Sequence, residues 1–405
     1  MPRQTPFFSR LEPYNKPKIW DHWAGYLSAP RYQYSAITEY YAIRDGVGVF
    51  DTSPLFKYRI SGSGAGGFLD HVMVRPMSDL AVGKGRYSCW CNPEGFVMED
   101  GVVLRAGEDE FLLATVQPNL RYLRGLASSN DVDVDDISEA YGVLALQGPH
   151  SHTVLRRLTS DVDGLGYFGV ARTLLRNIPV MLSRTGFTGD LGYEIWVEAE
   201  SAVALFDLLF EEGGGYNIKP VGETALSMAR IEAGLLLIDV DFQSARFAWV
   251  DAQRETPAEL GWGWMVDVDR EFIGRSAIAT EYETGSTRWS TVGLTIDWHE
   301  YERLYRGLGL VAPKEGVLAQ ETMTVYRSDG TYAGYATSFV YSSLLKRHIA
   351  IAKLPLDLAK PGSAVQLELV PIHRPENVQA TVVDLPFYAP ARKTAMIGTT
   401  RSERT

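Results

Sequence analysis

The stretch Ser183–Ile195 (SRTGFTGDLGYEI) combines a carboxylate, Glu194, with three glycines between two apolar segments. The apolar residues on either side predict two strands. Ile195 and Val197 would share one face of the second strand, and Glu194 and Trp196 the other. Glycine allows a close backbone approach, so we interpret the stretch as a loop that presents Glu194 to a small molecule. An ordinary glycine-rich hairpin is the alternative.

A second group of polar residues lies in the predicted hairpin Tyr87–Val103, where Asn92–Gly95 forms the turn and Glu99 and Asp100 follow it. Adjacent carboxylates on a strand point to opposite faces, so only one of the two can address a given pocket. The alternative is a solvated hairpin tip.

A third group is the helix end Arg230–Gly234 (RIEAG), where Arg230 and Glu232 lie on different sides of the helix. A lone helical arginine commonly forms a surface contact or a salt bridge. A ligand contact is the functional alternative.

The elements around these groups predict an α+β body. Strands and helices alternate without a strict βαβ order, and neither a phosphate loop nor a dinucleotide-binding glycine motif is present. From about Thr291 the sequence changes to short strands separated by glycine turns, which predicts a C-terminal β-barrel. The polar segment 281–288 is the expected linker. The predicted parts are an aromatic N-terminal arm (1–33), a main body of two interleaved subdomains (34–285), the barrel (286–390) and a flexible tail (391–405).

Size and charge narrow the class of protein. A chain of 405 residues exceeds one hydrophobic core, so several domains are expected. The net charge of −11 comes without a basic stripe, which argues against nucleic acid as a partner. No apolar run is long enough to span a membrane, and the first residues lack the apolar core of a signal peptide, so the cytoplasm is the expected location. Cys89 and Cys91 have a spacing that suits no zinc site, and no metal is expected.

Taken together, the motifs resemble the glycine cleavage T-protein (aminomethyltransferase) family, which includes folate-dependent demethylases. Ser183–Ile195 is similar to the family signature S-R-T-G-Y-T-G-E-D-G-Y-E-I. Other segments resemble family motifs in the same order along the chain: Asn92–Asp100 (N-x-x-G-G-I-x-D-D), Leu144–Pro149 (L-x-L-Q-G-P), Arg230–Leu235 (R-x-E-A-G-L), Phe272–Gly274 (F-I-G), Gly334–Ser338, Ile349–Ala350 and Leu385–Tyr388.

The resemblance implies a cloverleaf of three subdomains around a central channel for tetrahydrofolate. Asp100 takes the place of the family's functional aspartate, beside the reactive nitrogens of the folate. Glu194 takes the position that hydrogen-bonds the amino edge of the pterin. Tyr87, Arg230 and Trp264 fall where the family places other folate contacts, and Trp262 competes with Trp264 for the last of these.

Two departures from the family pattern bear on the one-carbon donor. The D-D-L of the turn reads Glu99-Asp100-Gly101 here, and the usual P-L-Y-G-x-E/D reads Leu236–Phe242 (LLIDVDF). These changes favour an altered donor, so the sequence predicts transfer of a methyl group from a small methylated compound to N5 of tetrahydrofolate, a demethylase. A true aminomethyltransferase acting on a lipoyl carrier protein is one alternative, and a non-catalytic folate-binding accessory protein is another.

Overall fold

The chain passes four times between two structural units. A computed structural model describes residues 2–127, 131–314 and 318–398. Unit 1 comprises residues 1–88, 100–226 and 389–405, and unit 2 comprises residues 89–99 and 227–388. Within the described residues, no helix is long and apolar enough to cross a membrane.

Unit 1 contains a six-stranded sheet of order β10-β11-β12-β9-β3-β13, antiparallel except for the β3–β13 pair. Its strands are β3 (Val47–Asp51), β9 (Tyr141–Gln147), β10 (Val170–Leu175), β11 (Ile178–Ser183), β12 (Gly192–Glu198) and β13 (Ile218–Pro220). Ile195 and Val197 on β12 join a large apolar core on one face of this sheet, as the alternation predicted, and Trp196 packs on the opposite side. Apolar alternation therefore specifies which face of β12 carries Glu194.

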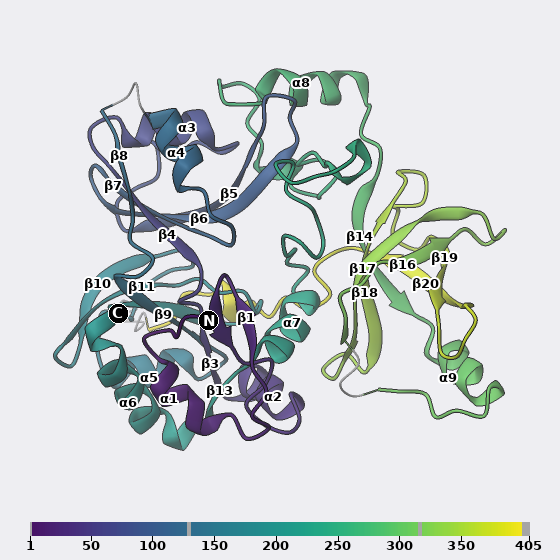
Figure 1. The fold of residues 1–405 in the computed structure, drawn as a ribbon, viewed down its shortest axis with the longest axis horizontal. Coiled ribbons are helices and arrows are strands. Elements are labelled where there is room, and N and C mark those ends of the chain that lie inside the picture. The colour runs from purple at the N-terminus through teal and green to yellow at the C-terminus, as the bar shows by residue number, and fades with distance from the viewer. Residues whose placement is uncertain (1, 128–130, 315–317, 399–405) are drawn as a thin grey trace, which may run out of the picture. The chain divides into compact units, whose positions relative to one another are not determined.

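Helices α1 (Phe8–Leu11), α5 (Ser151–Arg156) and α6 (Ala202–Gly213) contribute apolar residues to that core, and Figure 1 shows them gathered beside the sheet. Phe7, Leu11 and Tyr32 of the expected N-terminal arm are part of the same core. The arm is more regular than expected, because it contains α1 and the hairpin of β1 (Asp21–Trp23) and β2 (Tyr26–Ser28). Helix α2 (Ile37–Asp45) leads directly into β3.

The second sheet of unit 1 has five strands in the order β5-β6-β7-β4-β8, with the last residues of β5 (89–91) and the first of β6 (97–99) assigned to unit 2. They are β4 (Phe56–Ser61), β5 (Lys84–Cys91), β6 (Val97–Gly107), β7 (Glu110–Thr115) and β8 (Asp133–Asp136), accompanied by helices α3 (Ala65–Val72) and α4 (Leu120–Ala127). Leu104 and Leu112 of this sheet pack with Val143, Met181 and Trp196 of the six-stranded sheet. The two sheets of unit 1 therefore share an apolar layer.

Unit 2 contains helices α7 (Glu223–Glu232, whose first residues lie in unit 1), α8 (Arg275–Thr284) and α9 (Trp298–Gly307), followed by a barrel. The barrel strands are β14 (Ser290–Ile296), β16 (Met323–Tyr326), β17 (Tyr332–Ser342), β18 (Arg347–Leu354), β19 (Ala364–Leu369) and β20 (Glu376–Val383). These six close on themselves because β17 pairs with both β16 and β18, and β15 (Leu318–Ala319) adds to β17. The α+β class and the C-terminal β-barrel are confirmed.

Two expected boundary segments are more ordered than the sequence indicated. Residues 281–284, assigned to a polar linker, form the last turn of α8, which ends at Gly285 in a left-handed conformation. Residues 391–398, assigned to a flexible tail, contact unit 1 through the ion pair of Arg392 with Asp190 and through hydrogen bonds. The remainder of that predicted tail, residues 399–405, lies outside the described residues.

Candidate active site

Glu194 lies on β12 between two neighbouring strands, directly opposite Ser183 of β11 and Ala145 of β9. The Thr185 hydroxyl donates to its carboxylate, and the hydroxyls of Ser183 and Thr185 are 2.7 Å apart. Burial raises the pKa of Glu194, and the bonds from Thr185 and Ser183 partly offset this. The loop thus holds a half-buried carboxylate in one orientation.

Gln147 explains two of the three glycines in this loop. Its side-chain amide is buried against the loop, donating to the Thr185 carbonyl at 3.2 Å and accepting from the Thr188 hydroxyl at 2.8 Å. A Cβ atom at Gly186 or at Gly192 would come within 2.2 Å of Gln147 Oε1. Glycine is therefore required at both positions for this amide to support the loop from inside.

Asp100 lies on β6 and accepts a hydrogen bond of 2.8 Å from the Tyr87 hydroxyl on β5. Burial raises the pKa of Asp100 to about 6, against the lowering effect of the Tyr87 bond. The departure at Gly101 has a local packing reason, because a Cβ there would come within 2.7 Å of the Ala114 carbonyl oxygen on β7. Asp100 can therefore bind or release a proton close to neutral pH.

The two carboxylates lie on the sheet faces that meet inside unit 1. Asp100 is on the same side of β6 as Leu104, and Glu194 is on the same side of β12 as Trp196, since alternate residues of a strand share a face. Leu104 and Trp196 belong to one apolar cluster between the two sheets. The fold of unit 1 therefore directs Tyr87, Asp100 and Glu194 toward one layer.

Arg230 belongs to unit 2, where it is fully buried at the end of α7. It forms an ion pair with Asp241 and donates to the Ser338 hydroxyl on β17 at 2.8 Å. Asp241 also accepts hydrogen bonds of 2.6 Å each from Thr337 and Ser338. Asp241 therefore connects the divergent segment 236–242 to α7 through the ion pair and to the barrel through the two hydroxyls, and a folate contact for Arg230 stays a prediction.

Trp264 is also in unit 2, on the short 3-10 helix η5 (Gly263–Met265), and 68% of its surface is exposed. Trp262 is only 7% exposed and packs edge-on against Phe242, with ring centroids 5.2 Å apart. The two tryptophans would share a face on a strand, but the turn here gives them different environments. Trp264 is the more accessible of the two for a ligand, and its folate contact stays a prediction.

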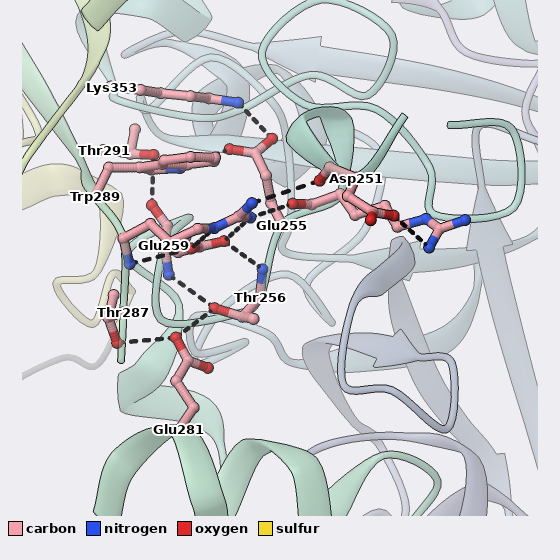
Figure 2. A network of polar contacts seen from close by, with 11 residues as sticks. Asp251, Glu255, Thr256, Glu259, Glu281, Thr287, Trp289, Thr291 and Lys353 are labelled. Carbon is pink, nitrogen blue, oxygen red and sulfur yellow. Dashed lines mark hydrogen bonds and ion pairs between the residues drawn. The ribbon is translucent and has the colours of Figure 1, made fainter. Parts of the chain in front are cut away.

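A polar network in unit 2 went unnoticed in the sequence (Figure 2). Lys353 of β18 forms a buried ion pair with Glu255, which also accepts from the Trp289 indole at 3.1 Å. The Arg288 guanidinium donates to both carboxylate oxygens of Glu259, at 2.6 and 2.8 Å. The Glu255 carbonyl accepts from the Val97 amide at 2.7 Å, so the network also holds the start of β6, the strand that carries Asp100. The signal in the sequence that could have indicated this network was Lys353, a charged residue at the end of the apolar run of β18.

A second set of ion pairs, in unit 1, was also missed. Asp190 of the glycine-rich loop pairs with Arg44 of α2 and with Arg392 near the end of the chain. Nothing local in the sequence links these residues, because residues 227–388 of unit 2 lie between Asp190 and Arg392 in the chain.

Comparison with known proteins agrees with this architecture. Residues 8–270 match the GCVT N-terminal domain, and residues 305–389 match the glycine cleavage T-protein C-terminal barrel domain. An aminomethyltransferase of Saccharopolyspora erythraea is 30% identical over 394 residues, covering 96% of this chain and 98% of that protein. An aminomethyltransferase of Geobacillus kaustophilus is 30% identical over 369 residues, covering 89% and 92%.

A solved structure shares the fold. The crystal structure of glycine cleavage system aminomethyltransferase T from Bartonella henselae superposes with a TM-score of 0.81 at 22% identity, covering 96% of this chain and 99% of that one. Both family domains are thus present in order, and relatives match over nearly the full length. The chain belongs to the glycine cleavage T-protein (aminomethyltransferase) family.

Proposed function

We propose that this protein is a tetrahydrofolate-dependent aminomethyltransferase, which takes its one-carbon unit from an aminomethyl group on the lipoyl arm of a carrier protein. The observation that carries the proposal is the pair of carboxylates, Asp100 and Glu194, on the facing sheets of unit 1, each with its pKa raised by burial. The names of the relatives support the same activity.

Glu194 suits the amino edge of a pterin. That edge presents an amide N–H and an exocyclic amine, and one carboxylate can accept from both in two charge-assisted hydrogen bonds. Thr185 fixes the Glu194 carboxylate, and Gln147 fixes the loop that carries Thr185. A carboxylate held in this way loses little conformational freedom when a ligand binds. We therefore assign recognition of the pterin to Glu194.

Asp100 suits the proton transfer that accompanies one-carbon transfer. When bound, tetrahydrofolate supplies the N5 nitrogen that receives the carbon. Asp100, with a pKa near 6, can take a proton from a neighbouring nitrogen, and its negative charge stabilises a developing cation. The Tyr87 hydroxyl orients this carboxylate. We therefore assign catalysis to Asp100 and its positioning to Tyr87.

The choice of donor follows from the relatives and from the two departures in sequence. The demethylase prediction rested on Glu99–Gly101 and Leu236–Phe242. Gly101 is explained by the close approach of β7, and Asp241 in the second segment keeps an acidic side chain for Arg230. Because Gly101 has a packing cause and Asp241 retains the acidic residue of the family pattern, neither feature requires a new donor, and the names of the relatives make the aminomethyl donor the better supported alternative.

The test is a donor panel with tetrahydrofolate present in every reaction. One arm contains an aminomethyl-loaded lipoyl carrier protein, and the others contain a methoxy-aromatic compound, a sulfonium compound or a methylamine. We expect 5,10-methylene-tetrahydrofolate and ammonia with the carrier alone. Formation of 5-methyl-tetrahydrofolate with a small compound, and no turnover with the carrier, would establish the demethylase instead. Binding of tetrahydrofolate without turnover in any arm would favour an accessory protein.

A further inference from the structure

The segment that follows the barrel, residues 391–397, lies against the glycine-rich loop of unit 1. We propose that Arg392 is a positioning residue for Glu194: the C-terminal segment clamps the outside of the loop and thereby sets the affinity for tetrahydrofolate. This inference rests on the proposed function, because it takes Glu194 as the residue that recognises the pterin.

The first contact of the clamp is made by Asp190, whose side chain is fully buried. The Arg392 guanidinium donates to both of its carboxylate oxygens, at 2.6 and 2.8 Å, and Arg44 approaches one of them at 3.2 Å. Arg44 also donates to the Thr188 carbonyl at 2.9 Å. Such a two-pronged pairing fixes direction as well as distance, so Arg392 restrains the loop at Asp190.

The second contact is made by Arg184, which is 1% exposed. Its guanidinium donates to backbone carbonyls of the C-terminal segment, at 3.2 Å for Arg392, 3.2 Å for Lys393 and 2.7 Å for Ala395. Farther along, the Ile397 carbonyl accepts from the Gly164 amide at 3.0 Å. The segment is thus anchored by its backbone carbonyls through Arg184 and by the Arg392 side chain through Asp190.

The clamp is connected to Glu194 through one residue. Thr185, which donates to the Glu194 carboxylate, directly follows Arg184, the residue held by the C-terminal segment. Gln147 supports the same residue from the inner side of the loop. Thr185 is therefore held by Gln147 directly and by the C-terminal segment through Arg184, and loosening the second of these should leave the Glu194 carboxylate less precisely placed.

The experiment measures tetrahydrofolate affinity of the full chain by fluorescence quenching. Arg392→Met removes the side-chain half of the clamp but leaves Asp190 paired with Arg44. Lys393→Met is the matched control: it also removes one positive charge from the segment, and its backbone carbonyl is unchanged. Its side chain lies over the Tyr167 ring rather than the loop. Arg392→Lys tests whether keeping the positive charge preserves binding. Thermal melting followed by circular dichroism checks that each variant is folded.

We expect Arg392→Met to weaken binding by about 2- to 30-fold, the range for coupling through a packed network. Arg392→Lys should recover part of this loss, and Lys393→Met should bind like the wild type. In a Glu194→Ala background, Arg392→Met should change affinity by less than about twofold, because the residue it positions is gone.

Two results would overturn the inference. One is equal affinity of Arg392→Met and Lys393→Met, and the other is an undiminished effect of Arg392→Met in the Glu194→Ala background, which would indicate general loosening. Wild-type protein that fails to bind tetrahydrofolate would instead refute the proposed function, and the inference with it. If Arg392→Met does not fold, the Arg392→Lys variant in both backgrounds decides between the same outcomes.

Discussion

At the scale of single residues, Asp100 and Glu194 have different hydrogen-bond partners within the same layer of unit 1. A phenol donates to Asp100, whereas an aliphatic hydroxyl in a rigid loop donates to Glu194. Burial raises the pKa of both carboxylates, and it raises the pKa of Asp100 to about 6. Two acids with distinct surroundings can serve distinct roles in one site. The assignments of catalysis to Asp100 and recognition to Glu194 follow this difference.

The Tyr87–Asp100 hydrogen bond predicts a pH effect. If ionised Asp100 is the active form, kcat of the wild type should fall as the pH drops through about 6. The Tyr87 bond lowers the pKa of Asp100, so Tyr87→Phe should raise that pKa and move the acidic limb of the kcat profile to higher pH. Measuring kcat from pH 5 to pH 9 (roughly the range in which such groups titrate) tests this. If the acidic limb of the kcat profile stays at the same pH in Tyr87→Phe, the group that titrates is not Asp100.

The raised pKa of Asp100 also predicts how the stability of the protein changes with pH. The sign of this change is opposite to that expected for a carboxylate in an ordinary ion pair. Because the pKa of Asp100 is higher in the folded chain than in the unfolded one, the folded state binds more protons between the two values. Stability is therefore lost as the pH rises from the unfolded pKa to about 6. Asp100→Asn should raise the melting temperature at pH 8, and the gain should shrink toward pH 4 (on the order of the usual aspartate pKa). Equal gains at both pH values would contradict the assignment.

At the scale of elements, the glycine-rich loop depends on the Gln147 amide, which occupies the space that side chains at two glycines would need. Gly192→Ala should displace this amide and weaken tetrahydrofolate binding by about 1 kcal/mol or more, since a buried amide loses its partners. Gly215→Ala is the matched control, because no atom beyond its neighbours in the chain lies within 4 Å of the added methyl group. Titration of both variants with tetrahydrofolate tests this, and equal affinities would show that Gln147 does not support the loop.

The polar network of unit 2 predicts a non-additive effect on stability. Lys353→Met leaves Glu255 buried without its charged partner and should cost about 3–5 kcal/mol. Adding Glu255→Gln removes the charge but keeps an oxygen for the Trp289 indole, so the double variant should recover most of the loss. Chemical denaturation measures both.

An exposed ion pair of the same barrel, Arg327–Asp357, provides the control for that prediction. Asp357→Asn should change stability little, because exposed pairs are screened by solvent. If the double variant is as unstable as Lys353→Met, the loss does not come from leaving the charge of Glu255 buried without a partner. It would then come from losing the attraction between Lys353 and Glu255.

The sequence predicted elements well where a local pattern specified them. The alternation around Glu194 placed Ile195 and Val197 in the core, and the glycine turns after Thr291 indicated the barrel. The contacts of Arg392 and Lys353 were not predictable in this way, because their partners lie far away in the chain. The prediction of an irregular N-terminal arm underestimated its order for the same reason. Phe7 and Leu11 pack into a core that is built from residues later in the chain.

At the scale of the whole molecule, family membership and the order of motifs were accessible from the sequence, because each motif is a local requirement of the fold. The donor was not, because departures such as Gly101 have packing causes that only the paired strand β7 reveals. The two predicted groups of site residues also belong to different units, with Tyr87, Asp100 and Glu194 in unit 1 and Arg230 and Trp264 in unit 2.

The most direct test of the account compares wild type, Asp100→Asn and Glu194→Gln in two measurements: tetrahydrofolate affinity, and kcat with an aminomethyl-loaded carrier protein at saturating tetrahydrofolate. We predict that Asp100→Asn lowers kcat by about 10²- to 10⁴-fold with affinity little changed. Glu194→Gln should weaken binding and retain most of kcat at saturation. Full turnover by Asp100→Asn, or unchanged affinity of Glu194→Gln, would contradict the division of roles between these two carboxylates.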